Sequence, residues 1–539
     1  MKVSLSFEKL LKGAAIVLML SACLGGFLPT VCNGQVSQTQ RYEREQKNSE
    51  DYFNVMSLKG EGLALFRKRD KYKNNNQIWE LIHLDTALRE KATLELEVKD
   101  RHNMIGYEVT PGVIYLLFRT GETTKNDFEL IGVDLETKQS TRYQIKPELD
   151  FKVTHFIKAG GNFIFGGYVN SEPAIILYEL VNKNIRVIPG FFQKDTELVD
   201  LRTNQNQTFN TVLIDRGSRD DRKLVLRTFD ETGKQLLEDV VPIDEKKSLQ
   251  TGITSALERE DLAVLGTWGD RNSKQSIGFY FMNVDPFQDQ TIKYVDFGQL
   301  SHFTDYLSPK RAERIKENSR NDAAAGRVPN FTDYVMPFKV SEYQHGFLLL
   351  AEVYDPVSSV NPYYSNPYYY NPYYSPYGLN SFGGFYYPGL SRMYRPFMYN
   401  NTTRNTNEIR THETVLLSFS PDGKVNWDYS IKLEEMKLPG IEQVSDFCMV
   451  GERLYFLYKK ESDLRLKIVN PQEKLAEENT VKVKTSDPLD EIRSEKEYEG
   501  GVRQWVDNAF YVWGYQTIRN TTKEDRVRDV FYINKVSVK

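Results

Sequence analysis

Residues 161–182 read GNFIFGGYVNSEPAIILYELVN, two apolar runs on either side of a short polar gap. Gly161 opens the first run, Asn170 and Ser171 lie in the gap, and the second run ends at Asn182. Gly, Asn and Ser are residues that favour turns. Short apolar runs bounded by turn signals are typical of strands that are buried on both faces. The stretch therefore predicts a pair of adjacent buried β-strands.

The same pattern recurs along the chain. Besides Gly161, its copies begin at Gly62, Gly112, Asn210, Asp261, Gly346, Gly451 and Asn508. The first five starting positions lie 49–51 residues apart, and the later intervals of 85, 105 and 57 residues leave room for two insertions. A shorter strand pattern such as FKVTHFI usually precedes each copy, and a more polar one such as RYQI often follows. Each unit is therefore predicted to contain four strands.

A single four-stranded sheet leaves both of its faces uncovered, and stacking such sheets around an axis buries them. We therefore predict an all-β protein, a β-propeller of eight four-stranded blades over residues 51–539. Seven blades are the alternative if the first and last copies share one blade to close the ring. Two or three tandem β-sandwiches are a rival interpretation, which the regular spacing disfavours.

The composition agrees with a large β protein and excludes several classes. The chain has 539 residues, of which 40% are apolar, 27% charged and 13% aromatic. Aromatic residues favour strands, and this content is too high for a disordered chain. A net charge of −4 argues against a general nucleic-acid binder.

Residues 1–34 are predicted to be a signal peptide. Lys2, Lys9 and Lys12 give a positive start, and residues 14–20 (AAIVLML) form a short apolar core. An export signal places the protein outside the cytoplasm.

Two cleavage sites fit this signal. Residues 20–23 (LSAC) resemble a bacterial lipobox, which implies that Cys23 becomes the lipidated first residue and holds the protein at the outer membrane or periplasmic face. Cleavage after Gly34 would instead release a secreted or periplasmic soluble protein. A retained membrane anchor is a third interpretation, which the glycines and proline that follow the apolar core disfavour.

Residues 35–50 (QVSQTQRYEREQKNSE) are polar and predict a linker between the signal and the propeller. The three cysteines, Cys23, Cys32 and Cys448, form neither a disulfide framework nor a metal pair. Cys448 is predicted to be a small buried residue.

The first insertion, residues 301–329, is predicted to be helical. Ser308 suits the N-cap, Pro309 the first helical position, and Gly326 the end. Its basic and acidic residues are interleaved, which favours a solvated face over a site for an anionic partner. Leu307 and Ile315 would rest on the propeller.

The second insertion, residues 357–410, lies between the central strands of the sixth copy. Residues 361–378 read NPYYSNPYYYNPYYSPYG, with a proline about every five residues. Proline prevents a regular helix and removes donors from a strand ladder. We therefore predict a long Tyr/Pro/Asn-rich loop outside the blades.

Tyrosine rings offer a large contact area at low entropic cost. The functional interpretation is a loop that recognises an envelope protein or glycan, and the alternative is low-complexity sequence packed on its own propeller. The candidate partner-binding residues are Tyr363, Tyr364, Tyr368, Tyr369, Tyr370, Tyr373, Tyr374, Tyr377, Tyr386 and Tyr387.

No catalytic motif stands out. The chain has no G-x-S-x-G, H-E-x-x-H, P-loop or G-x-G-x-x-G pattern, and its six histidines have no metal-ligand spacing. His155 is interpreted as a buried structural residue. We expect no cofactor and no metal, although an acid/base pair assembled across blades would leave no trace in the spacing.

Residues 420–427 (SPDGKVNW) resemble the Asp-box of sialidase-like propellers, with Ser420, Asp422 and Trp427 in matching positions and Gly423 one place early. In that family the box is a structural hairpin turn. The chain as a whole resembles exported bacterial β-propeller proteins over residues 51–539, which implies a fold and a compartment but no activity.

The sequence thus favours an exported envelope protein that binds a partner or acts as a scaffold, without catalysis and without a nucleic-acid partner. The alternative is a hydrolase or lyase acting on a glycan or peptide, with its site at the propeller axis. The two differ because an enzyme needs convergent polar residues with perturbed acids around that axis.

Overall fold

A computed structural model describes residues 36–357 and 408–539 of the chain. Within these two ranges the gaps are residues 48, 121–126, 218–219, 256–261, 272, 274, 286–289, 439–442, 474, 497–498 and 524–525. The predicted signal peptide, with Cys23, and the ten candidate tyrosines lie outside the described residues.

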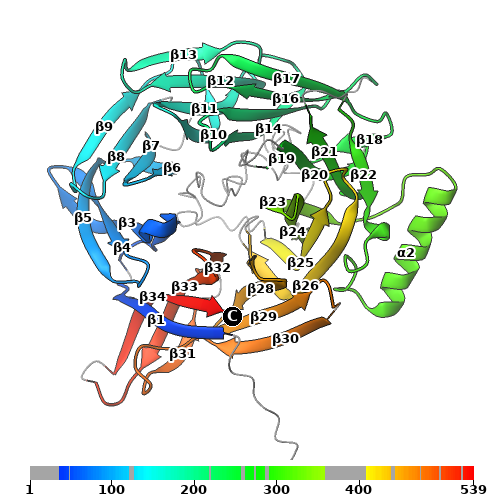
Figure 1. The fold of residues 1–539 in the computed structure, drawn as a ribbon. Coiled ribbons are helices and arrows are strands. Elements are labelled where there is room, and N and C mark those ends of the chain that lie inside the picture. Colours follow the sequence, from blue (N-terminus) through cyan, green and yellow to red (C-terminus); the bar gives the residue numbers. More distant parts are fainter. Residues whose placement is uncertain are drawn as a thin grey trace, which may run out of the picture.

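The described strands form eight antiparallel sheets arranged as blades around one axis (Figure 1). Eight blades are therefore confirmed, and the seven-blade alternative is wrong. The regular repeat predicted the positions of the blades correctly. The second strand of each sheet begins within two residues of a predicted starting position.

Blades 1–4 follow one another without insertions. Blade 1 contains β2 (Asn54–Ser57), β3 (Leu63–Lys73), β4 (Asn76–Leu84) and β5 (Glu90–Lys99), with a 3-10 turn, η1 (Lys59–Glu61), before β3. Blade 2 contains β6 (His102–Thr110), β7 (Val113–Thr120), β8 (Phe128–Asp134) and β9 (Ser140–Ile145). Blade 3 contains β10 (Lys152–Ala159), β11 (Asn162–Val169), β12 (Glu172–Glu179) and β13 (Asn184–Ile188). Blade 4 contains β14 (Thr196–Thr203), β15 (Phe209–Asp215), β16 (Lys223–Phe229) and β17 (Gln235–Pro242).

Blades 5–7 carry the insertions. Blade 5 contains the split inner strand β18 (Lys247–Leu249) and β19 (Ile253–Thr254), then β20 (Leu262–Asp270), β21 (Gly278–Val284) and β22 (Lys293–Asp296). A 3-10 turn, η2 (Phe297–Gln299), and the helix α2 (Pro309–Ala324) follow. Blade 6 contains β23 (Tyr334–Tyr343), β24 (Gly346–Val357), β25 (Glu408–Phe419) and β26 (Val425–Leu438). Blade 7 contains β27 (Ser445–Val450), β28 (Arg453–Lys460), β29 (Asp463–Asn470) and β30 (Leu475–Lys482).

Blade 8 joins the two ends of the described chain. Its inner strand is split into β31 (Glu491–Glu495) and β32 (Gly501–Gln504), followed by β33 (Ala509–Arg519) and β34 (Val527–Val538). The outermost strand is β1 (Val36–Glu45), which pairs with β34 from Val36 opposite Val538 to Glu45 opposite Val530. The ring is thus closed by a strand from the start of the described chain.

This closure corrects one prediction. Residues 35–50 were predicted to be a polar linker, but residues 36–45 form β1. The outer strand of a blade has one solvated face, so a polar strand resembles a linker in sequence. Within β1 only Tyr42 is fully buried.

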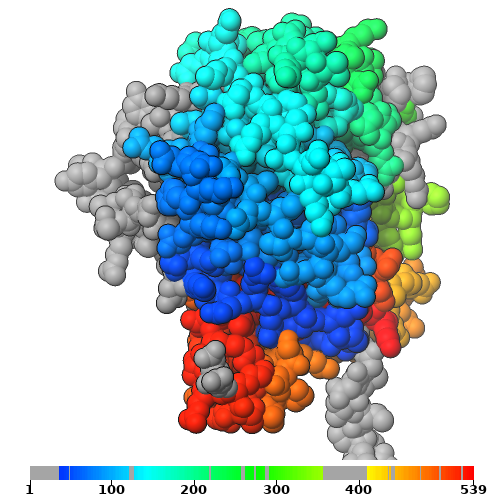
Figure 2. Space-filling model, turned by 90° about the vertical axis from the view of Figure 1, so that its left-hand side faces the viewer, coloured from blue at the N-terminus to red at the C-terminus, as the bar shows by residue number. Residues whose placement is uncertain are grey.

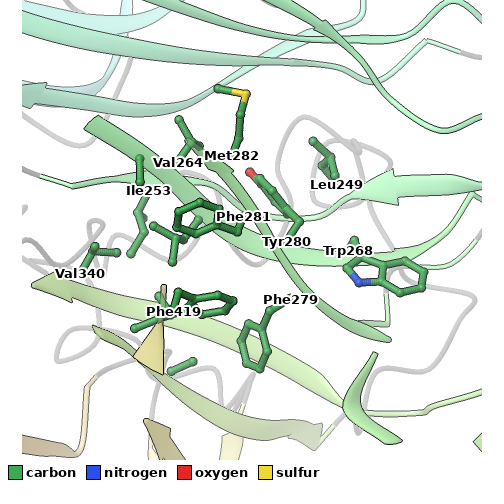
Figure 3. Packing of buried hydrophobic residues seen from close by; sticks show 14 of the residues in the cluster. Leu249, Ile253, Val264, Trp268, Phe279, Tyr280, Phe281, Met282, Val340 and Phe419 are labelled. Carbon is green, nitrogen blue, oxygen red and sulfur yellow. The ribbon is translucent and has the colours of Figure 1, made fainter. Parts of the chain in front are cut away.

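The core is a ring of interfaces between blades. Seven clusters of buried apolar side chains fill the spaces between successive blades, and the largest spans blades 4, 5 and 6. Figure 3 shows that cluster, with Phe279 and Phe281 of β21 on the side of Phe419 from blade 6. The rings of Phe281 and Phe419 stack with their centroids 5.5 Å apart. Because both faces of a central strand meet another blade, its apolar run is nearly continuous.

The helical insertion agrees with its prediction. Ser308 is the N-cap, although its side chain makes no cap hydrogen bond, and Pro309 is the first helical residue. The helix ends at Ala324, and Gly326 adopts a positive φ of 65° just beyond it. Ile315 packs against the large core cluster, whereas Leu307 is only partly buried. Helix α2 lies at the rim, outside blades 5 and 6 (Figure 1).

Candidate binding face

Both insertions emerge on the same face of the propeller. In each blade the chain runs through antiparallel strands, so successive turns alternate between two faces of the disc. The turn between the second and third strands shares a face with the connection to the next blade. The first insertion connects β22 to β23, and residues 358–407 connect β24 to β25. We call this face the insertion face.

The described chain begins on the opposite face. Val36, the first residue of β1, lies opposite Val538, near the end of the third strand of blade 8. The third strand of every blade ends on the face away from the insertions, which we call the terminal face. Figure 2 views the disc from its rim, with the red hairpin of β33 and β34 extending at the lower left. Both described chain ends thus lie on the terminal face.

Blade 6 supplies a stem for the second insertion. Strands β24 and β25 stay paired as far as Val357 opposite Glu408, at the end of the described hairpin. In neighbouring blade 7 the corresponding strands, β28 and β29, contain eight residues each, against twelve in β24 and in β25. The stem therefore extends past the strands of blade 7, and its two ends are the residues that flank residues 358–407.

Aromatic residues anchor the first insertion in the core. Phe297, Leu300, Phe303 and Phe331 belong to the large cluster. The rings of Phe297 and Phe303 stack with centroids 3.8 Å apart, and Phe331 meets Phe297 edge-on at 5.5 Å. Burying side chains of this size contributes about 1.5–3 kcal/mol each. The segments on either side of α2 are thus held by burial.

Polar contacts attach the same insertion to the outer strand of blade 6. The Asp428 carboxylate accepts hydrogen bonds from the backbone N–H groups of Ser301 (2.8 Å) and His302 (2.6 Å). His302 Nδ1 lies 2.8 Å from Asp305 Oδ2, and this hydrogen bond raises the pKa of His302. The His302 ring also stacks on Tyr429, with centroids 5.2 Å apart.

A cluster of four side chains joins the insertion to the stem. The Tyr306 ring stacks on His412, with centroids 5.9 Å apart and an interplanar angle of 20°. The Tyr306 hydroxyl donates to the Asp333 carboxylate, and His412 Nε2 lies 2.9 Å from Asp355 Oδ2. Burial raises the pKa of both Tyr306 and Asp333, so the hydroxyl keeps its proton and remains the donor. We call Tyr306, Asp333, Asp355 and His412 the stem cluster.

Buried acids occur at the contacts between blades. Glu352 of blade 6 accepts hydrogen bonds from the backbone N–H groups of Val444 (2.8 Å) and Ser445 (2.9 Å) at the start of blade 7. Burial raises the pKa of Glu352 to about 8. Asp200 of blade 4 accepts from the N–H (2.6 Å) and hydroxyl (2.7 Å) of Thr254 in blade 5, and burial raises its pKa to about 6. Both acids act as clamps that bind the backbone or a hydroxyl of the next blade.

An ion pair continues this pattern. Lys339 Nζ of blade 6 lies 3.0 Å from Asp446 Oδ1 of blade 7, with both side chains buried. Asp446 Oδ2 accepts a hydrogen bond from the backbone N–H of Gln504 in blade 8, at 2.9 Å. A single carboxylate thus connects three consecutive blades close to their inner strands.

Glu413 of β25 is another buried acid, and it lies next to the stem. Its side chain is fully buried, and burial raises its pKa well above the usual range. The neighbouring Ser430 hydroxyl donates to the backbone carbonyl of His302 at 3.1 Å.

Among the described residues, no group of three or more His, Cys, Asp or Glu side chains could hold a metal ion.

A groove opens on the insertion face between blades 7 and 8. Its volume is about 620 Å³. One end is the turn at Glu461 and Ser462, and the walls are residues 482–485 and the strand β31. At its base Glu495 lies 2.5 Å from Lys459 and accepts hydrogen bonds from Tyr532 and Ser462, both at 2.6 Å.

Several residues singled out in the sequence have structural roles. His155 is buried, which lowers its pKa to about 4, and Cys448 is a buried free thiol with its pKa raised to about 12 by burial. Residues 420–424 form the predicted hairpin turn between β25 and β26, and residues 425–427 begin β26. In the turn Gly423 has a φ of 78°, and its N–H donates to the Ser420 carbonyl. These three predictions are confirmed.

Sequence reasoning missed the stem cluster and the blade clamps. Tyr306, Asp333, Asp355 and His412 come from four separate segments, and no spacing connects them. His412 was noted only as one of six scattered histidines. Glu352 lies within an otherwise apolar run, GFLLLAEV, and a charged residue inside such a run is the one signal that could have indicated a buried polar contact.

Comparisons with known proteins add little to this geometry. No protein-family model matches the chain, and no curated protein matches it. The polysaccharide lyase Uly1 is 8% identical and covers 94% of this chain and 100% of its own, with a TM-score of 0.39. A eukaryotic initiation factor is 9% identical, covering 91% and 92% with a TM-score of 0.40. The β-propeller domain of the Trilobed protease from Pyrococcus furiosus is 9% identical, covering 80% and 93% with a TM-score of 0.33. At these values the likenesses carry no activity over to this chain.

Proposed function

We propose that this chain is an exported protein of the bacterial cell envelope that binds a partner through its insertion face and performs no catalysis. The observation that carries the proposal is the convergence of both insertions on one face, where the stem cluster joins them. Long loops held by a rigid scaffold are the usual carriers of recognition. The candidate tyrosines belong to the segment that this stem carries.

The buried acids support a structural use of the contacts between blades. A catalytic acid must reach a substrate, and raised pKa values at an axis would suggest such a group. In Glu352 and Asp200 the oxygens with partners accept hydrogen bonds from the adjacent blade, and Glu352 also accepts one from Thr414 of its own blade. Their pKa values are raised because they are buried between blades, so the shifts do not require a substrate site.

Attachment to a membrane through Cys23 is part of the proposal. Because β1 starts at Val36, only residues 24–35 separate Cys23 from the propeller, a span of roughly 40 Å when fully extended. The terminal face would then lie toward the membrane and the insertion face away from it. Among the described residues, no helix is long and apolar enough to cross a membrane. Replacing Cys23 with Ser is expected to move the protein from the membrane fraction to the soluble fraction, and unchanged membrane retention would exclude lipidation there.

Site-specific crosslinking in intact envelopes tests the binding face. A photo-crosslinking amino acid is placed at Thr332 on the insertion face or at Thr137 on the terminal face, both exposed. We expect a discrete crosslinked partner from position 332, lost when residues 358–407 are replaced by a short turn. Equal crosslinks from both positions, or crosslinks that persist without residues 358–407, would contradict the proposal and direct attention to the axis and an enzymatic role.

A further inference from the structure

The groove between blades 7 and 8 lies apart from the stem cluster and has its own chemistry. A volume of about 620 Å³ lies within the range of small-molecule sites, roughly 300–1,000 Å³. Nine of its twelve lining residues are polar or charged, including the hydroxyl residues Ser462, Thr485 and Ser494, although apolar atoms make up the larger part of the lining surface. Val483, Pro488 and Ile492 are the apolar residues of the lining. A polar, hydroxylated ligand suits such a surface better than an apolar one.

Two of the carboxylates that line the groove are buried, and each is paired with a basic side chain. The Asp490 carboxylate is fully buried and lies 2.7 Å from Arg528 and 2.8 Å from the Asn520 amide. Burial alone would raise the pKa of Asp490, but these hydrogen bonds lower it. Glu495 is 1% exposed and is neutralised by Lys459. Of the three carboxylates in the lining, only Glu461 is exposed.

The positive charges lie at the surface. Lys482 is 80% exposed, but its Nζ already lies 2.6 Å from Asp463 Oδ1. Arg493 is 44% exposed, and its Nε lies 3.5 Å from Oε2 of Glu491, which is itself 65% exposed. Lys484 is exposed, and its backbone carbonyl accepts hydrogen bonds from Arg41 and Asn534, both at 2.9 Å. These bonds fix the backbone from which the Lys484 side chain extends. Lys484 and Arg493 are therefore the exposed cations that an anionic ligand could reach, beside the exposed carboxylates of Glu461 and Glu491.

The strand that forms one wall is poorly suited to an extended peptide. Strand β31 has five residues, is irregular between Ile492 and Ser494, and carries charges at Glu491 and Arg493. Short, bulged and charged edge strands hinder the addition of another strand. A peptide would thus lose the backbone pairing that usually supplies its affinity.

We propose that this groove binds an acidic saccharide, a sugar unit that bears a carboxylate or sulfate group. Lys484 and Arg493 hold the anionic group. The hydroxyl oxygens of Ser462 and Thr485 accept hydrogen bonds from the sugar, because their protons are already donated to Glu495 and to the Asp487 carbonyl, and Ser494 can donate or accept. None of the described residues that line the groove is aromatic, so binding depends on charge and hydrogen bonds and weakens as salt rises. The inference goes beyond the partner-binding function proposed above and stands without it.

Calorimetric titration of the full mature chain tests this site. The probes are trigalacturonate for the carboxylate source, sulfated maltotriose for the sulfate source, and neutral maltotriose. We expect at least one acidic trisaccharide to bind and the neutral one to bind at least tenfold more weakly. The double variant K484Q/R493Q is expected to weaken binding about tenfold or more, because charge-assisted hydrogen bonds are lost.

The matched control is K310Q/R314Q, which removes the same two charges from the exposed surface of α2 on the rim. It is expected to leave the affinity within twofold. No binding of either acidic probe, equal binding of the neutral one, equal loss in both double variants, or affinity unchanged at high salt would each overturn the proposal. Because the titration uses purified protein and no envelope partner, its failure leaves the crosslinking result unaffected.

Discussion

Glu352 shows how one side chain can connect two blades. One of its oxygens accepts two backbone N–H groups at the start of blade 7, in a site that excludes water. The clamp is absent from any sequence pattern because its donors, Val444 and Ser445, lie more than ninety residues away. The sequence correctly predicted that residues 346–353 form a buried strand, but it could not predict what the acid within it contacts.

The raised pKa of Glu352 gives a prediction about pH. The carboxyl ionises near pH 4.5 when exposed and near pH 8 in the fold, so the folded state holds its proton more tightly. Its contribution to stability is therefore complete below pH 4.5 and is lost as the pH rises toward 8. We expect E352Q, which retains an acceptor oxygen and cannot ionise, to flatten this loss, which is on the order of a few kcal/mol.

Chemical unfolding at several pH values measures this effect. Glu136, an exposed acid in the turn after β8, provides the matched control, and E136Q should keep the wild-type pH dependence. If E352Q and wild type lose stability in parallel between pH 5 and 8, Glu352 does not carry the proton that the structure assigns to it.

At the scale of single elements, the helical insertion is connected to the stem of blade 6 by the stem cluster. The insertion was predicted as a helix from its caps, and those positions were right because capping is local in sequence. Its attachment was not predictable, since Tyr306 and His412 lie far apart in the sequence and no local pattern pairs them. Local sequence signals thus predicted the helix, whereas its position depends on contacts with distant residues.

Removing the Tyr306 hydroxyl tests this attachment. In Y306F the largely buried Asp333 carboxylate loses its donor, which is expected to cost about 1–3 kcal/mol. The loss should appear as faster amide hydrogen exchange in α2 and at the β24–β25 stem. Tyr72, whose side chain is 59% exposed, supplies the control Y72F, which should exchange like wild type. Unchanged exchange in Y306F would mean that the aromatic anchors hold the insertion without the stem cluster.

The second insertion provides the complementary prediction. Replacing residues 358–407 with a short Gly-Asn turn keeps Val357 opposite Glu408 and leaves the stem cluster intact. We therefore expect the unfolding temperature to change by less than about 2 °C, measured by calorimetry on both forms. A large drop would show that the tyrosines contribute to the core, contrary to the prediction that they form a loop outside the blades.

At the scale of the whole molecule, the repeat predicted the ring and missed how it closes. Eight copies of a buried strand pair gave eight blades because each copy packs against its neighbours in the same way. The closing strand β1 has no such signature, since a polar strand of ten residues, VSQTQRYERE, resembles a linker. Its partner, β34, lies at the other end of the sequence, where no local pattern can indicate it.

The position of β1 also bears on how the protein is processed. Lipidation at Cys23 and cleavage after Gly34 both leave Val36–Glu45 in the mature chain. Either product can therefore close the ring, and the choice between them affects only attachment to a membrane. Stability measurements on β1 are consequently independent of which signal interpretation is correct.

Removing β1 tests the closure directly. A form that begins at Gln46 lacks the strand, whereas one that begins at Gln35 retains it. Without β1 the edge of β34 is exposed, and three links to blade 1 are lost. They are the Tyr42 hydroxyl bond to Glu90 and the Arg44–Glu80 ion pair, each 2.7 Å, and the Arg44–Glu90 ion pair at 3.1 Å. Together with the buried Tyr42 ring, we expect a loss on the order of 5 kcal/mol. Light scattering should also show dimers or larger species, because an open strand edge pairs with other chains. If both forms are monomeric and unfold at the same temperature, the other strands of blade 8 close the ring without β1.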